Sequence, residues 1–478
     1  MHEPENRKDH EMLEHIKVVL EQLDNGQKPY LDVDEIEDMC DYLFEDERVA
    51  EAERLTEYGM TLHPESVNLM LTRASMLIDN NKFSQAKALL DYVLPMECNN
   101  PELYLNYGWL ELKQNNVEEA IVHFDEALEL NEKNHLMEDD IIFEIGLNLN
   151  LFDYFSQSTF YLEMYIERHP HDPKALFELA YAYDKTQLLD KSIITYEHLV
   201  DISPFYETAW YNLGILYWRK EEYEKSVNAY NTAITINVEY PEPYFNLGNN
   251  YMNMGEYEKA LDSYIEYISL CKTDIENVVY QYIGECWAEL DDSEYSLQFY
   301  LLATEKMPDN ANAWYGCGVE YMDLGNNPQC INMVSKAIDI DPECADYYFT
   351  VAHAYANMMQ KDNAIPMLEM ALHYAPNDVY GWLELLKLNL LRDASFNIPQ
   401  FIEDAYTKYG RNEAIKYMHA FVLHTAYKNK EREVVRLLSE IAASDKSLLY
   451  DVLDHPYAGT LLRDSKIMSK LEKMGIKI

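Results

Sequence analysis

One phrase recurs along most of the chain at intervals of about 34 residues. Residues 209–230 (AWYNLGILYWRKEEYEKSVNAY) hold one copy, whose apolar and small positions are Trp210, Leu213, Gly214, Tyr217, Ser226 and Tyr230. The first four have the spacing i, i+3, i+4, i+7 of one helix face, and the last two share a face of a second helix. The connection between them is short enough to force a tight turn. The repeated unit is therefore predicted to be an antiparallel helix pair.

The glycine of the phrase indicates where the two helices approach each other. Glycine inside a helix costs about 1 kcal/mol relative to alanine, so we expect it where a neighbouring helix comes very close. Gly214 and Ser226 are both small and would meet there. Gly214→Val is expected to overpack the contact at a cost of roughly 1–3 kcal/mol. Two further glycines, Gly255 and Gly325, lie in the turns and are expected to adopt a left-handed conformation.

Eleven copies in nearly constant phase organise the chain. They begin near residues 33, 67, 101, 139, 173, 207, 241, 277, 311, 345 and 379, and the last is degenerate. The spacing lengthens at NEKNHLME and at CKTDIENV, which we interpret as loop insertions. Residues 1–32 are predicted to form an N-terminal cap helix, 33–411 the repeat array, and 412–478 a divergent helix pair with a C-terminal capping helix. Because one helix pair cannot bury its apolar face alone, the predicted fold is all-α, a right-handed α-solenoid superhelix of about 11–12 antiparallel helix pairs.

This pattern resembles the tetratricopeptide repeat family, whose units are 34-residue helix–turn–helix pairs with a W…LG…Y…A…F…A…P phrase. A well-matched copy consists of Tyr244, Leu247, Gly248, Tyr251, Ala260 and Tyr264. The resemblance covers about residues 33–411 and implies that the first helices of successive units line a concave face that receives a peptide or helix. The residues that the resemblance assigns to this peptide-binding groove are Trp109, Phe143, Phe177, Tyr181, Tyr211, Trp218, Phe245, Asn249, Tyr315 and Phe349.

Two interpretations of these aromatic columns stay open at the level of sequence. Aromatic side chains in a concavity are common anchors for a protein partner. The same side chains could instead be buried against the next repeat. The columns also lack the matching set of lysine, asparagine and arginine with which co-chaperone members of the family clamp a C-terminal carboxylate, so that use is not expected here.

The charge balance excludes several classes of partner. The chain holds 38 basic and 85 acidic residues, for a net charge of −47. Nucleic acid is bound mainly through Lys and Arg, so neither nucleic acid nor an anionic membrane is an expected partner. The charge is uneven, since residues 407–478 hold 13 basic and 9 acidic residues and the first 406 hold 25 and 76. We interpret the basic end as an ordinary solvated helix face, with docking on this or another chain as the alternative.

No motif for catalysis, a cofactor or a metal stands out. The sequence lacks GxxxxGK[ST], a GxGxxG after a strand, and GxSxG. HEMLEH places His10 and His15 five residues apart, which turns them to different sides of a helix. Cys317 and Cys330 occupy small-residue positions of the repeat and are expected to be core. We therefore predict no catalytic, cofactor-binding or metal-binding residues.

The predicted function is a non-catalytic scaffold that binds a partner segment in an apolar and aromatic concave groove. The alternative is a regulatory or chaperone-like subunit that activates or assembles a separate enzyme complex. The partner is expected to be a protein or peptide with an apolar or basic segment. Seven cysteines without a CxxC pair, a beginning without an apolar signal core, and no run of about 18 apolar residues lead us to expect a cytoplasmic location. The sequence does not identify the partner, the pathway or the oligomeric state.

Overall fold

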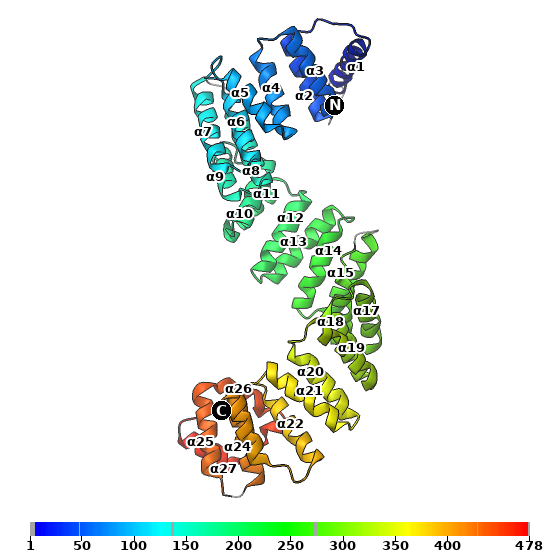
Figure 1. The fold of residues 1–478 in the computed structure, drawn as a ribbon, viewed down its shortest axis with the longest axis vertical. Coiled ribbons are helices and arrows are strands. Elements are labelled where there is room, and N and C mark those ends of the chain that lie inside the picture. Colours follow the sequence, from blue (N-terminus) through cyan, green and yellow to red (C-terminus); the bar gives the residue numbers. More distant parts are fainter. Residues whose placement is uncertain (1–4, 47, 135–137, 272–274, 428, 477–478) are drawn as a thin grey trace. The chain divides into compact units, whose positions relative to one another are not determined.

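A computed structural model describes residues 5–46, 48–134, 138–271, 275–427 and 429–476. Over these ranges the chain forms 27 α-helices, one short 3-10 helix and no strand, which confirms the predicted all-α class (Figure 1). The helices separate into two compact units, residues 1–220 and 221–478. The boundary falls in the turn of the copy that begins near residue 207. The expected contact between Gly214 and Ser226 would cross this boundary and stays a prediction.

Unit 1 is a series of helix pairs preceded by one helix. Its elements are α1 (Glu5–Asp24), α2 (Val33–Glu45), α3 (Val49–Leu62), α4 (Val67–Asp79), α5 (Phe83–Val93), α6 (Pro101–Lys113), α7 (Val117–Asn134), α8 (Glu138–Leu151), α9 (Phe155–Arg168), α10 (Pro173–Lys185), α11 (Leu189–Ile202) and α12 (Glu207–Arg219). The first helices α2, α4, α6, α8 and α10 each pack on the second helix of their own pair, and α9 also packs on α10. The insertion at NEKNHLME includes residues 135–137, which lie outside the described ranges.

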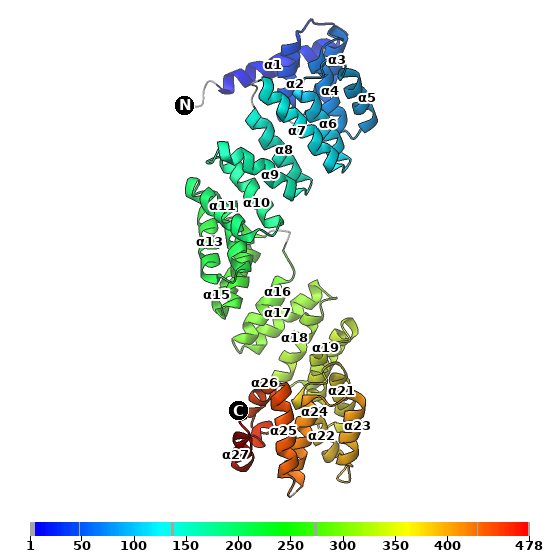
Figure 2. The same cartoon turned by 90° about the vertical axis from the view of Figure 1, so that its left-hand side faces the viewer.

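Unit 2 continues the pattern and ends in a more compact group of helices. Its elements are α13 (Tyr223–Ile236), α14 (Pro241–Asn253), α15 (Tyr257–Leu270), α16 (Val279–Glu289), α17 (Ser293–Lys306), α18 (Ala311–Asp323), α19 (Asn327–Ile340), α20 (Ala345–Asn357), α21 (Lys361–Tyr374), α22 (Val379–Arg392), α23 (Ile398–Tyr409), α24 (Glu413–Ala426), α25 (Glu431–Ser444), α26 (Lys446–Leu453), η1 (Ala458–Thr460) and α27 (Ser465–Lys473). Figure 2 shows α24 and α25 side by side next to α27. The insertion at CKTDIENV includes residues 272–274, outside the described ranges.

Capping side chains and prolines mark the N-termini of several first helices. Asp32 forms a capping box with Glu35 at the start of α2, and Asp172 accepts two backbone N–H bonds at the start of α10. These side chains satisfy backbone donors that a helix leaves free at its first turn. Proline occupies the first position of α6, α10 and α14, where the missing N–H costs nothing.

From α4/α5 to α20/α21, each turn within a pair contains one left-handed residue. Gly255 and Gly325 have φ values of 72° and 76°, which confirms their predicted conformation. The same turn position in the other pairs is left-handed without glycine, at Asn81, Asn115, Asp153, Gln187, Glu221, Asp291 and Met359. The left-handed conformation is strained for residues with a Cβ other than Asn and Asp. At Gln187 and Met359 the tight turn is therefore imposed by the packing of the two helices and not by a turn residue.

Small residues allow the two helices of a pair to approach closely. A Cβ added to Gly146 in α8 would lie 2.7 Å from Leu162 Cδ2 in α9. The Ser158 hydroxyl of α9 donates to the Gly146 carbonyl at 2.7 Å, and Ser296 donates to the Gly284 carbonyl at 2.8 Å in the same way. The serine of the phrase is therefore both small enough to fit and a hydrogen-bond donor across the pair.

The last pair of the array departs from this geometry. At the position of the close-contact glycine, α22 carries Leu386, which is 5% exposed. The principal neighbours of α22 are α21 and α24, and α23 packs only lightly on α24. Beyond it, Tyr417 of α24 donates to the Ala458 carbonyl at 2.8 Å, and Tyr380 of α22 donates to the Asp451 carbonyl at 3.0 Å. The final helices therefore fold back onto α22 and α24 as one core.

Candidate functional site

The predicted groove residues of unit 1 are partly covered by neighbouring rings. The ring centroids of Trp109 and Phe124 are 4.5 Å apart, and those of Phe143 and Tyr165 are 5.1 Å apart. Both partners belong to the second helix of the same pair. The rings of this column are half-buried because their own pair covers one side, and Phe143 also packs against the cluster of Leu162, Leu179 and Tyr183, which includes the next first helix.

Phe177 and Tyr181 extend this column along α10. Phe177 stacks on Tyr206, just before α12, at 5.4 Å and meets Tyr196 of α11 edge-on at 5.7 Å. Tyr181 contacts Phe155 of the preceding pair at 5.8 Å and carries a cation–π contact with Lys185. These aromatic side chains therefore join neighbouring pairs as well as facing outward.

The residues of α12 differ in how open they are. Tyr211 is half-buried, whereas Trp218 is 41% exposed. Trp218 is one of the large apolar side chains that the described residues leave accessible. An indole that stays accessible at a predicted groove position has the properties of a ligand anchor.

In unit 2 the column begins with an aromatic cluster around Phe245. Its ring lies 5.1 Å from Tyr267 and 6.1 Å from Tyr282, which belongs to the next first helix, α16. Asn249 is also engaged, because its Oδ1 accepts a hydrogen bond of 2.7 Å from the buried hydroxyl of Tyr264. Phe245 and Asn249 are thus part of the packing between α14, α15 and α16, with only part of each surface open.

Polar side chains interrupt the column in α16. Gln281 accepts a hydrogen bond of 2.6 Å from Asn310 and donates one of 2.7 Å to Glu285. Burial raises the pKa of the Glu285 carboxyl, and the Gln281 amide opposes that rise by stabilising the charged form. This part of unit 2 therefore presents a half-buried carboxylate where the neighbouring helices present rings.

The end of the column in unit 2 opens into a cavity. Tyr315 of α18 packs on Tyr347 of α20 at 4.9 Å. Phe349 lies against the backbone of Gly381, where a Cβ would come within 2.6 Å of its ring. Beside this contact is a cavity of about 390 Å³. Its lining residues are Phe349, His353, Asp378, Tyr380, Gly381, Leu383, Glu384, His455 and Tyr457.

The chemistry of this cavity is aromatic with acidic and imidazole groups. His455 packs on Tyr380 at 4.7 Å and accepts backbone N–H bonds from Tyr457 and Ala458 through Nδ1. Burial raises the pKa of the Asp378 carboxyl. The turn before η1 thus forms one wall, and α20 and α22 form the other. Sequence reasoning placed Phe349 here but missed His455, because only the folding back of the chain brings it to α22.

A second and larger cavity lies beside α23, and the sequence did not predict it. Its volume is about 570 Å³, and it is lined mainly by Ile398, Ile402, Tyr406, Arg411, His419, Val422, Tyr427 and Lys430. The Tyr406 hydroxyl lies 3.2 Å from His419 Nδ1. Burial raises the pKa of Tyr406 to about 12 and lowers that of His419. The sequence feature that could have indicated this cavity is Leu386, a bulky residue at the position where other repeats have the small close-contact residue.

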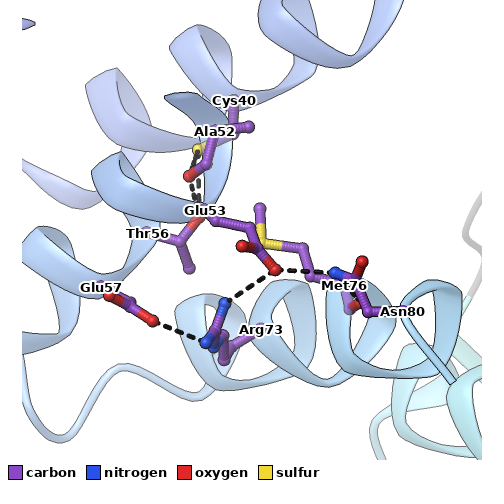
Figure 3. Close-up of polar contacts among 8 residues, drawn as sticks. All are labelled: Cys40, Ala52, Glu53, Thr56, Glu57, Arg73, Met76 and Asn80. Carbon is purple, nitrogen blue, oxygen red and sulfur yellow. Dashed lines mark hydrogen bonds and ion pairs between the residues drawn. The ribbon is translucent and has the colours of Figure 1, made fainter. Parts of the chain in front are cut away.

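A polar cluster in unit 1 holds the first two pairs together (Figure 3). Arg73 of α4 forms ion pairs with Glu57 at 2.6 Å and with Glu53 at 3.4 Å, both on α3. Asn80 donates to the same Glu53 at 2.7 Å. Because every charge here has a partner within the cluster, its role is structural.

The cysteines are unsuited to nucleophilic chemistry where they are buried. Cys317 and Cys330 are fully buried, which confirms their predicted place in the core. Burial raises the pKa of Cys317 to about 12 and that of Cys330 to about 11, and a thiol rather than a thiolate is unreactive. Over the described ranges, no group of three or more His, Cys, Asp and Glu side chains could hold a metal ion.

These features define an α-helical repeat protein of the solenoid class. Family models for the tetratricopeptide repeat match residues 101–134 and 241–274, residues 173–206 and residues 219–255. The chain is therefore a multi-repeat tetratricopeptide repeat protein, a class of scaffold for protein interactions. None of the helices in the described ranges is long and apolar enough to cross a membrane.

Comparison with known proteins gives one curated relative. It is the anaphase-promoting complex subunit CDC16 of Saccharomyces cerevisiae, with 28% identity over 120 residues, 23% of this chain. The matching region spans only 14% of that relative's length.

Solved structures with a similar fold include a tetratricopeptide repeat protein from Parabacteroides merdae, with 18% identity and a TM-score of 0.38, covering 52% of this chain and 98% of that one. Another is YrrB, described as a tetratricopeptide repeat protein with an unusual peptide-binding site, with 17% identity and a TM-score of 0.36, covering 39% and 95%.

Proposed function

We propose that the chain is a non-catalytic scaffold that binds a segment of a partner protein along the first helices of its repeats. The observation that carries the proposal is the cavity of about 390 Å³ beside Phe349. Phe349, which the repeat pattern assigns to the groove, borders this cavity. The volume of the cavity is in the range that is usual for ligand sites. The lining combines the aromatic rings of Phe349, Tyr380 and Tyr457 with histidine and carboxylate groups that could orient a bound side chain.

The same proposal gives the other groove residues unequal roles. Trp218 is accessible enough to act as an anchor. Phe245 and Asn249 mainly support the wall, because they already contact Tyr267 and Tyr264. The partner segment is expected to be apolar with basic residues, since the cavity includes Asp378 and Glu384 and the chain has a net charge of −47.

The test uses two variants that leave the repeat core intact. Trp218→Ala probes unit 1, and His353→Ala, at an exposed side chain that lines the cavity, probes unit 2. The full-length protein is used to isolate partners from extract of its own cells, and the partner identified by mass spectrometry is then titrated against each variant. We expect at least one variant to weaken binding about tenfold or more, as loss of an anchor does.

A matched control is Phe205→Ala, which removes an 82% exposed ring that lies in a loop outside the groove columns. Circular dichroism and thermal unfolding of all variants separate lost binding from lost fold. If both groove variants bind as tightly as the wild type while the control behaves the same, the groove proposal is wrong.

A second candidate is that the chain is a subunit that assembles or activates a separate enzyme complex. The match to a subunit of the anaphase-promoting complex supports this candidate, because that relative is named as part of a multi-subunit assembly. The tagged protein isolated from its own cells would then sediment with several partners in constant proportion. Recovery of one partner only, in varying amount, would contradict this candidate and leave the simple scaffold.

A further inference from the structure

The outer side of unit 1 carries a row of exposed apolar residues. Val122 of α7, Phe160 of α9 and Ile194 of α11 are 65%, 59% and 64% exposed. Each lies two positions after the small residue of its second helix, which is Ala120, Ser158 or Ser192. The three side chains therefore hold the same place in three successive pairs, and we call them the outer stripe.

The fold does not need apolar residues at this place. In unit 2 the same position holds Asn228, Asp262, Gln298 and Asn332, all of them exposed, and Pro366 in α21. The helices of unit 2 pair and pack with these polar residues in the same register. The outer stripe thus exposes apolar area in unit 1 that the repeat itself gives no reason to keep, and such a surface indicates an interaction site.

Polar contacts join the helices of the outer stripe. Tyr161 of α9 donates to Asp125 of α7 at 2.9 Å, and Lys191 of α11 pairs with Glu163 of α9 at 3.1 Å. Helices that are linked only through long side chains lie at least the roughly 10 Å of a packed pair apart, so the three residues extend over roughly 20 Å or more. That distance corresponds to about 14 residues of a bound helix.

The borders of the outer stripe are acidic. Glu118, Glu119 and Glu126 lie within one turn of Val122 and are exposed. Glu197 and Asp190 flank Ile194; Asp190 is paired with Lys220 at 2.8 Å, and the nearby Lys191 is paired with Glu163. A surface with an apolar centre and carboxylates on its borders is complementary to a helix with apolar residues on one face and Lys or Arg beside them.

We propose that the outer stripe docks a basic amphipathic helix of a partner protein. This site lies on the second helices of unit 1 and is separate from the groove residues, which lie on first helices. Neither site requires the other, so the inference stands whether or not the groove binds a ligand.

The test titrates the full chain with a fluorescent helical peptide of Leu and Lys, about 18 residues and roughly 27 Å long. A peptide with Glu in place of every Lys serves as the acidic probe. The stripe variant is Val122→Asn, Phe160→Asn and Ile194→Asn, which copies the polar residues of unit 2 without changing the net charge. Fluorescence anisotropy is expected to show binding of the basic peptide only, and a loss of about tenfold or more in the stripe variant.

The matched control replaces three other exposed apolar residues of unit 1, as Leu151→Asn, Leu188→Asn and Phe205→Asn. It is expected to bind like the wild type, and thermal unfolding shows whether each variant is folded. A border variant, Glu118→Gln, Glu119→Gln and Glu126→Gln, is expected to bind more weakly and with a shallower salt dependence.

Three results would overturn the proposal. The first is equal binding of the basic peptide by the stripe variant and the wild type, and the second is equal binding of the basic and acidic peptides. The third is a wild-type dimer in sedimentation that the stripe variant turns into a monomer with unchanged peptide affinity, which would make a second copy of the chain the occupant.

Discussion

The pairs α8/α9 and α22/α23 come from the same repeated phrase but pack differently. In α8, Gly146 lets Leu162 of α9 approach so closely that a Cβ would lie 2.7 Å from it. In α22 the corresponding residue is Leu386, and 12 residues after it α23 has Ile398 where α9 has Ser158, 12 residues after Gly146. With both small residues replaced, α22 packs on α24, and a cavity of about 570 Å³ opens beside α23.

The difference shows what the small residues of the phrase do. Helices pack by fitting side chains of one between those of the other, and the size of the contact residues sets their separation. Glycine with serine gives a close pair with a hydrogen bond across it. Leucine with isoleucine gives a helix that is held loosely by its own pair and takes part in a larger terminal core.

The largest expected effect on stability is at Leu386, in the α22/α23 pair with its bulky contact residues. Leu386→Ala should lower the free energy of unfolding of unit 2 by about 2–5 kcal/mol, because it leaves a cavity in a core that has no small-residue contact to close it. Hydrogen exchange over α22–α25 during urea unfolding is the measurement. A change below about 1 kcal/mol would show that Leu386 does not fill this core.

Gly146→Val should cost about 1–3 kcal/mol, because the added side chain would overlap Leu162 of α9. Chemical denaturation with hydrogen exchange over α8 and α9 measures it. The control is Gly255→Asn, since nothing lies within 4 Å of a Cβ at Gly255 and asparagine tolerates its positive φ. Equal costs for the two variants would mean that the close approach at Gly146 is not what glycine provides there.

Ser158→Ala isolates the hydrogen bond from the size of the residue. Removing the hydroxyl leaves the Gly146 carbonyl without its donor in a buried site, so we expect a loss of about 0.5–1.5 kcal/mol in denaturant unfolding. Ser158→Gly keeps the contact small as well and should be less stable still, because of the helix propensity of glycine. An unchanged stability in Ser158→Ala would assign the serine to size alone.

Met359→Gly tests whether the pair imposes its own turn. Met359 has a φ of 61°, and replacing it by glycine should raise the melting temperature by relieving strain of about 0.5–1 kcal/mol net. Gly255→Met is the reverse change at the equivalent turn and should lower the melting temperature. Two shifts of the same sign would contradict the idea that this turn strains residues with a Cβ.

The smallest expected effect is a pH dependence of stability at His419 of α24, beside the α22/α23 pair. Burial lowers the pKa of His419 in the folded chain. The unfolded chain therefore takes up a proton at this side chain near pH 6.5, whereas the folded chain takes it up only at lower pH. Stability therefore falls as the pH drops through this value, and the wild type should lose more between pH 7.5 and about 5.5 than His419→Gln does. Urea midpoints of both proteins at each pH measure the difference, and parallel curves would refute it.

Much of the fold could be predicted from sequence, but less of the site. The periodicity of Trp210, Leu213 and Tyr217 is local, so it indicated helix pairs without knowledge of the neighbours. Phe177 and Phe245 could be assigned to a column but not to a free surface, because Tyr206 and Tyr282 from the next repeat pack on them. The left-handed turn at Gln187 and Met359 had no sequence signal at all.

The sequence by itself determined that this chain is a series of antiparallel helix pairs, because helix periodicity and small contact residues act between side chains only a few residues or one turn apart. Only the tertiary structure decided which aromatic side chains stay accessible, that His455 returns to Tyr380, and that Val122, Phe160 and Ile194 are all exposed. The physical reason is that exposure depends on every neighbour that packs against a residue, and most of those neighbours come from other repeats.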